Sequence, residues 1–397
     1  MAYNIKNNVY WTGKMDWELR KFHGSEYSTF SGSSYNSYLI REEKTVLIDT
    51  VWTPFAKEFI DNLTAAIDPS KIDYIISNHA EPDHSGALPY LMDMVPDKPI
   101  YCTANGIKSL KGLYHRDWNF KQVKTGDRLS LGSKEIIFIE APMLHWPDTM
   151  FSYLTGDNIL FSNDAFGQHY ASSGLFNDLA DEKALWAECI KYYANILTPF
   201  SPLVSKKIKE FVSLNLPLDI ICTSHGVIWR DNPMQIVEKY LNWAENYQEN
   251  QITILYDTMW NGTRILAEHI AEGLREADPL TTVRLFNVAT TDKNDVITEV
   301  FKSKGILVGS PTINRSVLSS VAAILDQIQG LQFKNKKSAA FGCYGWSGES
   351  LKIINDHLIK SGFKVMESEC KALWNPDNDS LQNAYQFGID FSRFLNN

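Results

Sequence analysis

The sequence lacks several patterns that would place it in a specialised class of protein. Its five cysteines lie far apart without a C-x-x-C pair, which argues against a disulfide framework, a zinc ribbon and an iron–sulfur centre. No apolar run approaches the ~18 residues that a membrane-spanning helix needs, and no basic and apolar leader opens the chain. These absences favour a globular protein of a reducing compartment, which we predict to be the cytoplasm.

The charges form no block of one sign. The net charge is −9, so neither a nucleic-acid partner nor an anionic membrane surface is expected. A length of 397 residues predicts two or three domains, and a hydrophobic content of 44% suffices for packed cores.

The patterns of strands and helices change near residue 250. Before it, the stretches 37–51 and 151–164 each predict a hairpin, and residues 181–197 and 202–216 have helical spacing. After it, strand-like runs alternate with amphipathic helices, which predicts parallel βαβ units. These runs are residues 252–256, 281–288, 305–310, 337–343 and 363–368. We therefore predict an α/β protein with domains at 1–250 and 251–397.

Residues of the metal-binding type follow four apolar runs in the first domain. The stretch SNHAEPDHSG, residues 77–86, places four of them directly after a predicted strand, and three more each follow another run. One such residue alone is more often a hydrogen-bonded core or rim residue than a ligand. Together they predict a metal site, because a cation can serve as the partner of many buried polar groups. The seven candidates are His79, Glu81, Asp83, His84, His145, Asp164 and His225.

The second domain has three loops where a doubly wound sheet binds ligands. Residues 257–263, DTMWNGT, lie between a strand and a helix, where free backbone N–H groups favour an anion, although such a loop can also be a simple capping turn. It has no lysine and no G-x-x-x-x-G-K pattern, which argues against hydrolysis of a nucleoside triphosphate. Loops 310–316 and 343–350 follow two further strands.

This second domain resembles flavodoxin, in which the first loop holds the FMN phosphate and the other two loops enclose the ring. The resemblance implies that Thr258, Asn261 and Thr263 contact the phosphate, with Met259 and Trp260 in the same loop. The ring would lie between two further sets, of which Trp346 could instead be a surface aromatic that shields a turn. These sets are Pro311, Thr312 and Asn314 on one side and Tyr344, Gly345, Trp346 and Gly348 on the other.

The first domain resembles the metallo-β-lactamase-like fold, an αββα sandwich with a dinuclear metal site. Hydrolases of that superfamily usually carry H-x-H-x-D-H and bind zinc, whereas this chain has Glu81 at the second position. Four imidazoles and three carboxylates suit iron, and the donor set leaves zinc and manganese open. The resemblance implies one iron on His79, Glu81 and His145, a second iron on Asp83, His84 and His225, and Asp164 as the bridge.

Together the two domains resemble the flavodiiron proteins, or A-type flavoproteins, over essentially the whole chain. The resemblance extends to APMLHWPD, NDAFGQH, HGVIWR, YDTMW and VGSPTIN. It implies an oxidoreductase that reduces dioxygen to water, nitric oxide to nitrous oxide, or both, at a diiron site fed by FMN. Because no rubredoxin-like module with a cysteine knuckle follows, we expect a separate electron donor such as rubredoxin or reduced deazaflavin. The resemblance also implies a head-to-tail homodimer, or a tetramer of such dimers.

Two other functions remain open at this stage. The chain could be a dizinc hydrolase with a fused flavodoxin domain, which Glu81 argues against, or an electron carrier with a structural metal site. Tyr193, Trp146 and His169 are candidate neighbours of the metal ligands, although each could equally be a packing residue. Arg230 is a candidate for neutralising carboxylate charge near the site.

Overall fold

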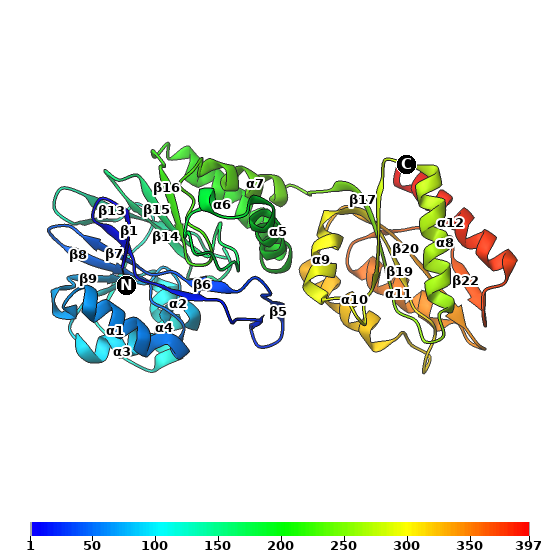
Figure 1. The fold of residues 1–397 in the computed structure, drawn as a ribbon, viewed down its shortest axis with the longest axis horizontal. Helices are drawn as coiled ribbons and strands as arrows, with labels where there is room; N and C mark the ends of the chain where they lie inside the picture. Colours follow the sequence, from blue (N-terminus) through cyan, green and yellow to red (C-terminus); the bar gives the residue numbers. More distant parts are fainter. Residues whose placement is uncertain (1, 397) are drawn as a thin grey trace. The chain divides into compact units, whose positions relative to one another are not determined.

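The computed structural model describes residues 2–396, and the chain divides into two compact units. The N-terminal unit comprises the residues up to Tyr193 together with Phe200–Ala244, and the C-terminal unit comprises Ala194–Pro199 together with Glu245 onwards. Each unit has its own layers of strands and helices (Figure 1). Within residues 2–396, no helix combines the length and the apolar content that crossing a membrane requires.

The N-terminal unit is a sandwich of two sheets. The first sheet has the order β1-β2-β7-β8-β9-β10-β11 and the second has the order β12-β13-β14-β15-β16. Their strands are β1 Tyr3–Lys6, β2 Val9–Trp11, β7 Tyr38–Arg41, β8 Thr45–Ile48, β9 Tyr74–Ile76, β10 Ile100–Cys102, β11 Phe120–Gln122, β12 Arg128–Ser130, β13 Glu135–Glu140, β14 Met150–Leu154, β15 Ile159–Asn163 and β16 Ile220–Thr223. Two small hairpin-like pairs complete the strands: β3 Lys14–Asp16 with β6 Ser33–Tyr35, and β4 Lys21–Phe22 with β5 Tyr27–Ser28.

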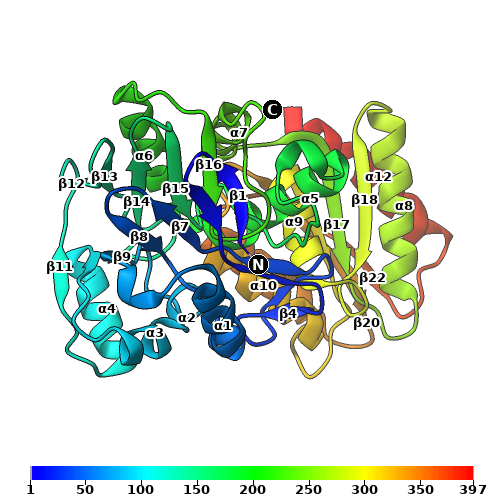
Figure 2. The same cartoon turned by 60° about the vertical axis from the view of Figure 1, so that its left-hand side comes forward.

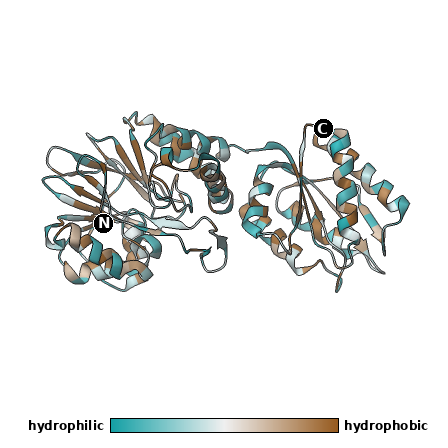
Figure 3. Cartoon of the chain, viewed as in Figure 1, coloured by the Kyte–Doolittle hydropathy of each residue, from teal (hydrophilic) through white to brown (hydrophobic). Residues whose placement is uncertain are grey.

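Both predicted hairpins are confirmed, since β7 pairs with β8 and β14 pairs with β15 in antiparallel register. The two sheets enclose a buried apolar core that includes Val46, Ile48, Phe138, Leu154 and Phe161. Figure 3 shows this arrangement: the strands in the middle of the unit are largely hydrophobic (brown), and the helices around them carry both hydrophobic and hydrophilic residues. One face of each sheet is thus buried against the other, and most of these strands are buried along their whole length.

Helices cover the outer faces of both sheets, which completes an αββα sandwich. Helices α1 to α4 lie on the side of the first sheet and α5 to α7 on the side of the second (Figure 1 and Figure 2). Their bounds are α1 Ala56–Ala66, α2 Pro82–Ser85, α3 Leu88–Met94, α4 Ala104–Tyr114, α5 Glu182–Tyr192, α6 Ser201–Ser213 and α7 Met234–Ala244. The helix predicted at 181–197 is α-helical only up to Tyr192 and continues as a π-helical turn at Tyr193–Leu197.

The C-terminal unit is a parallel sheet with helices on both faces. Its order is β18-β17-β19-β20-β21, with β22 also paired to β20, and every pairing is parallel. This order, 2-1-3-4-5 along the chain, is that of flavodoxin-like sheets. The elements are β17 Glu249–Tyr256, α8 Gly262–Ala277, β18 Thr282–Asn287, α9 Lys293–Lys302, β19 Ser303–Gly309, α10 Ser319–Leu331, β20 Lys337–Tyr344, α11 Glu349–Lys360, β21 Lys364–Val365, β22 Cys370–Leu373 and α12 Asn378–Asn396.

The fifth strand of this sheet differs from the prediction. A strand was expected at 363–368, but β21 has only two residues, and β22 resumes the pairing with β20 further along the chain. Four residues lie between the paired Val365 and Cys370, whereas only two lie between their partners Ser338 and Phe341. The two additional residues interrupt the strand, and β22 then leads the chain to the carboxyl edge of the sheet.

Helices α8 and α12 pack unusually closely on one face of the sheet. A Cβ atom at Gly273 would lie 1.9 Å from the carbonyl oxygen of Tyr385, and one at Gly388 would lie 2.2 Å from the carbonyl oxygen of Ile270. Only glycine fits at these two positions. This close contact fixes α8, whose first turn borders the site described below.

Candidate metal centre and flavin site

All seven predicted metal-binding residues follow strands that end at one edge of the sandwich. His79 follows β9, and Glu81 precedes the short helix α2, which carries Asp83 and His84. His145, Asp164 and His225 lie in the chain that follows β13, β15 and β16. Strands β13 and β15 are both antiparallel to β14, and β16 is parallel to β15, so these three strands end at the same edge.

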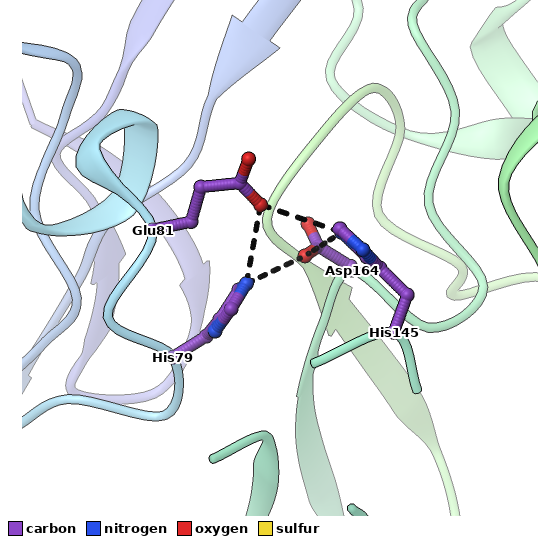
Figure 4. Close-up of side chains that lie close together, drawn as sticks. All are labelled: His79, Glu81, His145 and Asp164. Carbon is purple, nitrogen blue, oxygen red and sulfur yellow. Dashed lines mark hydrogen bonds and ion pairs between the residues drawn. The ribbon is translucent and has the colours of Figure 1, made fainter. Parts of the chain in front are cut away.

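Four of these side chains form a first cluster, and their ligand atoms lie within 4.8 Å of one another. Nε2 of His79 lies 3.3 Å from Oε2 of Glu81, and Nε2 of His145 lies 3.4 Å from the same oxygen. The same two nitrogens lie 3.7 and 3.2 Å from Oδ2 of Asp164. The four side chains point toward one another in Figure 4, which leaves room for one cation among them.

The other three side chains form a second cluster, whose ligand atoms also lie within 4.8 Å of one another: Asp83, His84 and His225. Nε2 of His225 lies 3.0 Å from Oδ2 of Asp83, and Nε2 of His84 lies 3.3 Å from it. The second carboxylate oxygen of Asp164 faces this cluster, because Oδ1 lies 2.9 Å from His84 and 3.5 Å from His225. Asp164 therefore offers one oxygen to each cluster.

The clustered groups shift one another's proton affinity. Burial alone would lower the pKa of His84, but the carboxylates of Asp164 and Asp83 outweigh it and raise that pKa to about 9. Burial would raise the pKa of Asp164, but His84 and His145 hold it well below its usual range. Among the described residues, no lysine or arginine forms an ion pair with the seven. Histidine protons thus balance the carboxylates, and a bound cation can replace those protons.

Several residues that contact the clusters carried no usable signal in the sequence. Oδ2 of Asp148 lies 3.2 Å from Nδ1 of His79, and Nε2 of His23 lies 2.9 Å from Oε1 of Glu81. Burial would lower the pKa of His23, but its hydrogen bond to Glu81 raises it. The sequence places Asp148 only three residues after His145 in HWPD, whereas His23 comes from the distant hairpin β4–β5.

The other residues named from the sequence have mixed outcomes. The ring of Trp146 meets the ring of His79 edge-on at 5.0 Å, and the ring of His169 lies 4.7 Å from that of His225, so both contact metal-ligand candidates. Tyr193 instead packs against Tyr240 and Trp243, and the neighbouring Tyr192 faces His169, as Tyr27 also does.

The predicted role of Arg230 has no support in its contacts. Its guanidinium donates to both carboxylate oxygens of Asp178, at 2.9 and 2.8 Å, and lies 3.8 Å from the centre of the Phe176 ring. Asp178 is exposed and Phe176 is half-buried against the core, and neither is a metal-ligand candidate. The positive charge is therefore neutralised by Asp178.

A cavity of about 710 Å³ opens at the carboxyl edge of the C-terminal sheet. It lies among the loops after β17, β19 and β20, which are the three loops predicted from the sequence. Nine predicted residues line it: Thr258, Met259, Trp260, Thr263, Pro311, Thr312, Tyr344, Gly345 and Trp346. Its size and its largely apolar and aromatic lining are typical of a cofactor site.

The cavity also differs from the prediction in detail. Asn261, Asn314 and Gly348 are not among the lining residues: Asn261 and Gly348 precede the first turns of α8 and α11, and Asn314 occupies a turn. Four lining residues were not predicted, namely Gly262, Cys343, Trp374 and Asn375. The last two follow β22, the strand that the sequence reading missed.

The end of this cavity beside α8 has donors without partners in the structure. The hydroxyl oxygen of Thr263 is buried without a hydrogen bond, and Asn261 gives α8 no side-chain cap. Helix α8 has 16 residues, so its dipole and free N–H groups favour an anion at this end.

Comparisons with known proteins agree with both halves of this description. The family described as ODP family beta lactamase matches residues 34–226, and the flavodoxin family matches residues 254–388. The anaerobic nitric oxide reductase flavorubredoxins of Salmonella arizonae and Klebsiella pneumoniae are both 56% identical over 395 residues, which cover 99% of this chain and 82% of each relative. These relatives do not favour a dizinc hydrolase.

Solved structures give the same result over the full length. Rubredoxin oxygen:oxidoreductase from Desulfovibrio gigas matches with a TM-score of 0.96 and 36% identity, covering 100% of this chain and 99% of that one. The flavodiiron protein from Giardia intestinalis matches with a TM-score of 0.91 and 32% identity, covering 100% and 97%. The predicted fold class is confirmed. The chain belongs to the flavodiiron protein family.

Proposed function

We propose that this chain reduces nitric oxide, dioxygen or both at a diiron centre that receives electrons from FMN. The observation that carries the proposal is the pair of buried clusters that share Asp164, in a chain that also has an FMN-sized cavity at its second sheet. Relatives named for nitric oxide reduction and for oxygen reduction support both gases as substrates.

The donor atoms of the clusters fit two metal ions. Both carboxylate oxygens of Asp83, both ring nitrogens of His84 and Oδ2 of Asp164 are buried without a hydrogen bond. Apart from their ion-pair contacts with one another, these atoms lack hydrogen bonds, which is costly in a protein interior unless a ligand or ion satisfies them. A set of nitrogen and carboxylate donors suits iron. We assign His79, Glu81, His145 and Asp164 to one ion and Asp83, His84, His225 and Asp164 to the other.

The C-terminal cavity fits FMN by the same test. The buried hydroxyl of Thr263 and the start of α8 would bind the phosphate, and Thr258 lies in the same loop. The ring would lie between the loop of Pro311 and Thr312 and the loop of Tyr344 to Trp346. Trp374 adds an aromatic wall, and its ring centre lies 6.3 Å from that of Trp346.

When the cofactors are bound, two ferrous ions supply one electron each and reduced FMN supplies two, which makes four electrons in total. Reduction of dioxygen to water needs all four, and reduction of two nitric oxide molecules to nitrous oxide needs two. The chain's own residues hold the ions close together and limit their access to water. The edge-on ring of Trp146 and the buried ring of His169 pack against two of the ligands. This packing keeps the imidazoles in place and lowers the local dielectric constant.

Turnover of the two gases and metal analysis test the proposal together. Protein with FMN and iron, reduced by one chemically reduced donor under anaerobic conditions, should consume nitric oxide, dioxygen or both. Zinc without iron in protein from the native source would contradict a reductase. Iron-loaded and reduced protein that consumes neither gas would leave only an electron carrier.

We also propose that the working enzyme is a head-to-tail homodimer, or a tetramer of such dimers. The cavity rim supports this, because Trp260, Trp346 and Trp374 are 85%, 87% and 63% exposed in the single chain. An exposed aromatic group of this kind marks a contact surface. A two-fold arrangement would let the FMN of each chain serve the irons of its partner.

Mixed dimers test transfer between chains. One chain carries Asp164→Ala, and the other has its FMN loop disabled at Thr258 and Thr263. Transfer between chains predicts that each mixed dimer keeps one complete site, formed by the flavin of the first chain and the irons of the second. Verified mixed dimers with no more activity than the separate parents would instead indicate transfer within one chain.

Three further assignments complete the proposal. The metal-binding domain would span residues 1–250 and the FMN domain 251–397, which the two compact units and the two family matches support. All five cysteines are free and buried, which supports the reducing cytoplasm as the location. A rubredoxin or a reduced deazaflavin would deliver the electrons, and the rubredoxin oxygen:oxidoreductase among the similar structures supports the former.

A further inference from the structure

The four clustered histidines are held in unequal ways. A metal-binding imidazole usually donates its second ring N–H to an acceptor, which fixes the ring and its tautomer. Nδ1 of His225 donates to the backbone oxygen of Ser34 at 2.6 Å, and Nδ1 of His79 faces a carboxylate oxygen of Asp148 at 3.2 Å. Neither ring nitrogen of His84 has a hydrogen bond. Among the described residues, His79 is therefore the one of these rings whose Nδ1 contacts a carboxylate outside the seven.

Asp148 is held through one carboxylate oxygen and its backbone, while its Oδ1 is buried without a hydrogen bond. Its Oδ2 also accepts the backbone N–H of Ala80 at 2.8 Å, and its backbone oxygen accepts the hydroxyl of Thr103 at 3.0 Å. The side chains of His79 and Asp148 are both 0% exposed. Because Asp148 acts as the acceptor, Nδ1 of His79 keeps its proton, and Nε2, which faces Glu81 and Asp164, is the nitrogen that would bind a cation.

The direct contact with an outside carboxylate belongs to the first cluster, although the buried carboxylate of Asp49 also acts on His84 through space. Among the described residues, no carboxylate outside the seven lies within 4.0 Å of a ring nitrogen of His84, His145 or His225. His23 acts on the first cluster in the opposite sense, since it donates to or shares a proton with Glu81. Its side chain is 36% exposed, however, so solvent screens it far more than it screens Asp148.

We propose that Asp148 is a positioning residue that makes the two metal positions unequal. It holds His79 with Nε2 toward the first cluster, and its buried charge favours the higher charge state of the ion bound there. This inference rests on the proposed diiron function and goes beyond it, because it names which of the two ions is harder to reduce: the one held by His79, Glu81 and His145.

Cobalt(II) is the first probe, because its binding to the apoprotein requires neither FMN nor gas turnover. Asp148→Asn keeps the shape of the side chain and removes its charge. We expect one of the two cobalt equivalents to bind about 10- to 100-fold more weakly, as is typical when such an outer partner is lost, while the other equivalent is unchanged. The matched control is Asp157→Asn, which removes the charge of another buried carboxylate of the same unit. Asp157 pairs with Lys134 and belongs to neither cluster.

A redox titration then separates the charge of Asp148 from its packing. In iron-loaded protein, Asp148→Asn should raise one of the two iron midpoint potentials and leave the FMN potentials unchanged. Asp148→Glu keeps the charge and should hold that potential nearer the wild-type value even if cobalt affinity falls. A merely structural role would give the same potentials in all folded variants.

Two results would overturn the inference: an equal weakening of both cobalt equivalents, or unchanged affinities together with unchanged potentials. If Asp148→Asn does not fold, the wild-type protein still decides the matter. Among the histidine N–H protons that cobalt shifts in the NMR spectrum, one should belong to Nδ1 of His79 and be protected from exchange with water, and an Nδ1 without a proton would contradict the inference. Failure of the proposed function would appear separately, as iron-loaded wild-type protein that consumes neither gas.

Discussion

Lys336 in the C-terminal unit offers a quantitative test of how burial controls stability. It precedes β20, is 3% exposed, and donates from Nζ to the backbone oxygens of Phe301 and Ser303 at 2.8 and 2.6 Å. These carbonyls lie at the end of α9, and no carboxylate among the described residues forms an ion pair with Lys336. Burial lowers the pKa of Lys336 from 10.5 to about 7.

The shift has a definite sign and size. Below pH 7 the lysine is charged in both the folded and the unfolded chain, and the folded chain carries the full cost of burying that charge. Between pH 7 and 10.5 the folded chain loses the proton while the unfolded chain keeps it, so the stability of the folded state rises with pH. A shift of this size corresponds to at most about 5 kcal/mol, gained at up to ~1.4 kcal/mol per pH unit.

The assay compares the wild-type chain with Lys336→Met by urea unfolding at pH 7, 8 and 9. We expect the variant to lose the pH-dependent gain, so that the difference in unfolding free energy between the two proteins changes by about 2 to 3 kcal/mol over this range. Lys334→Met, at an exposed lysine two residues earlier, is the control. Parallel pH profiles of wild type and Lys336→Met would refute the reasoning, because they would mean that Lys336 keeps its proton in the folded chain.

Three further predictions concern the cofactor sites. Asp164→Ala should lower turnover by more than ~100-fold and release iron while FMN stays bound, because even the loss of a residue that only supports a metal ligand costs ~10- to 100-fold. Iron analysis and flavin absorbance measure the two cofactors, and loss of flavin with intact iron would contradict this prediction. Glu81→His should raise the ratio of zinc to iron, and full iron with wild-type turnover would argue against the importance of Glu81. Gly345→Ala places a Cβ 2.9 Å from the ring of Trp374 and should weaken FMN binding about 5- to 100-fold without loss of iron, as measured by flavin fluorescence.

The metal cluster was predictable because its residues obey a local rule. Each of the seven follows or closely follows the end of a strand, and strand ends are visible in the sequence as the end of an apolar run. The hairpins β7–β8 and β14–β15 were predictable for a related reason, since their turns and alternation are local. What a single sequence could not supply is the pairing of strands across the sandwich, and the resemblance to a known family supplied it instead.

The missed residues depend on contacts between distant parts of the chain. His23 reaches Glu81 from a hairpin 58 residues earlier, and nothing in its own neighbourhood indicates this. Trp374 was missed because the fifth strand breaks after Val365 and resumes at Cys370, which moves the end of the strand beyond the expected run. Tyr192 and Tyr193 are adjacent, and the start of the π-helical turn decides which of them faces the site.

The two clusters also explain why folding and metal binding belong together in the N-terminal unit. The first sheet supplies His79 and Glu81 to one cluster and Asp83 and His84 to the other, while the loops of the second sheet supply His145, Asp164 and His225. Every cation bound here would therefore join both sheets. Without it, the buried carboxylates of the clusters are paired only with histidines, and several polar atoms lack hydrogen bonds. Metal binding would therefore also stabilise the packing of the two sheets against each other. Because Asp164 serves both clusters, the two ions would stabilise the same arrangement.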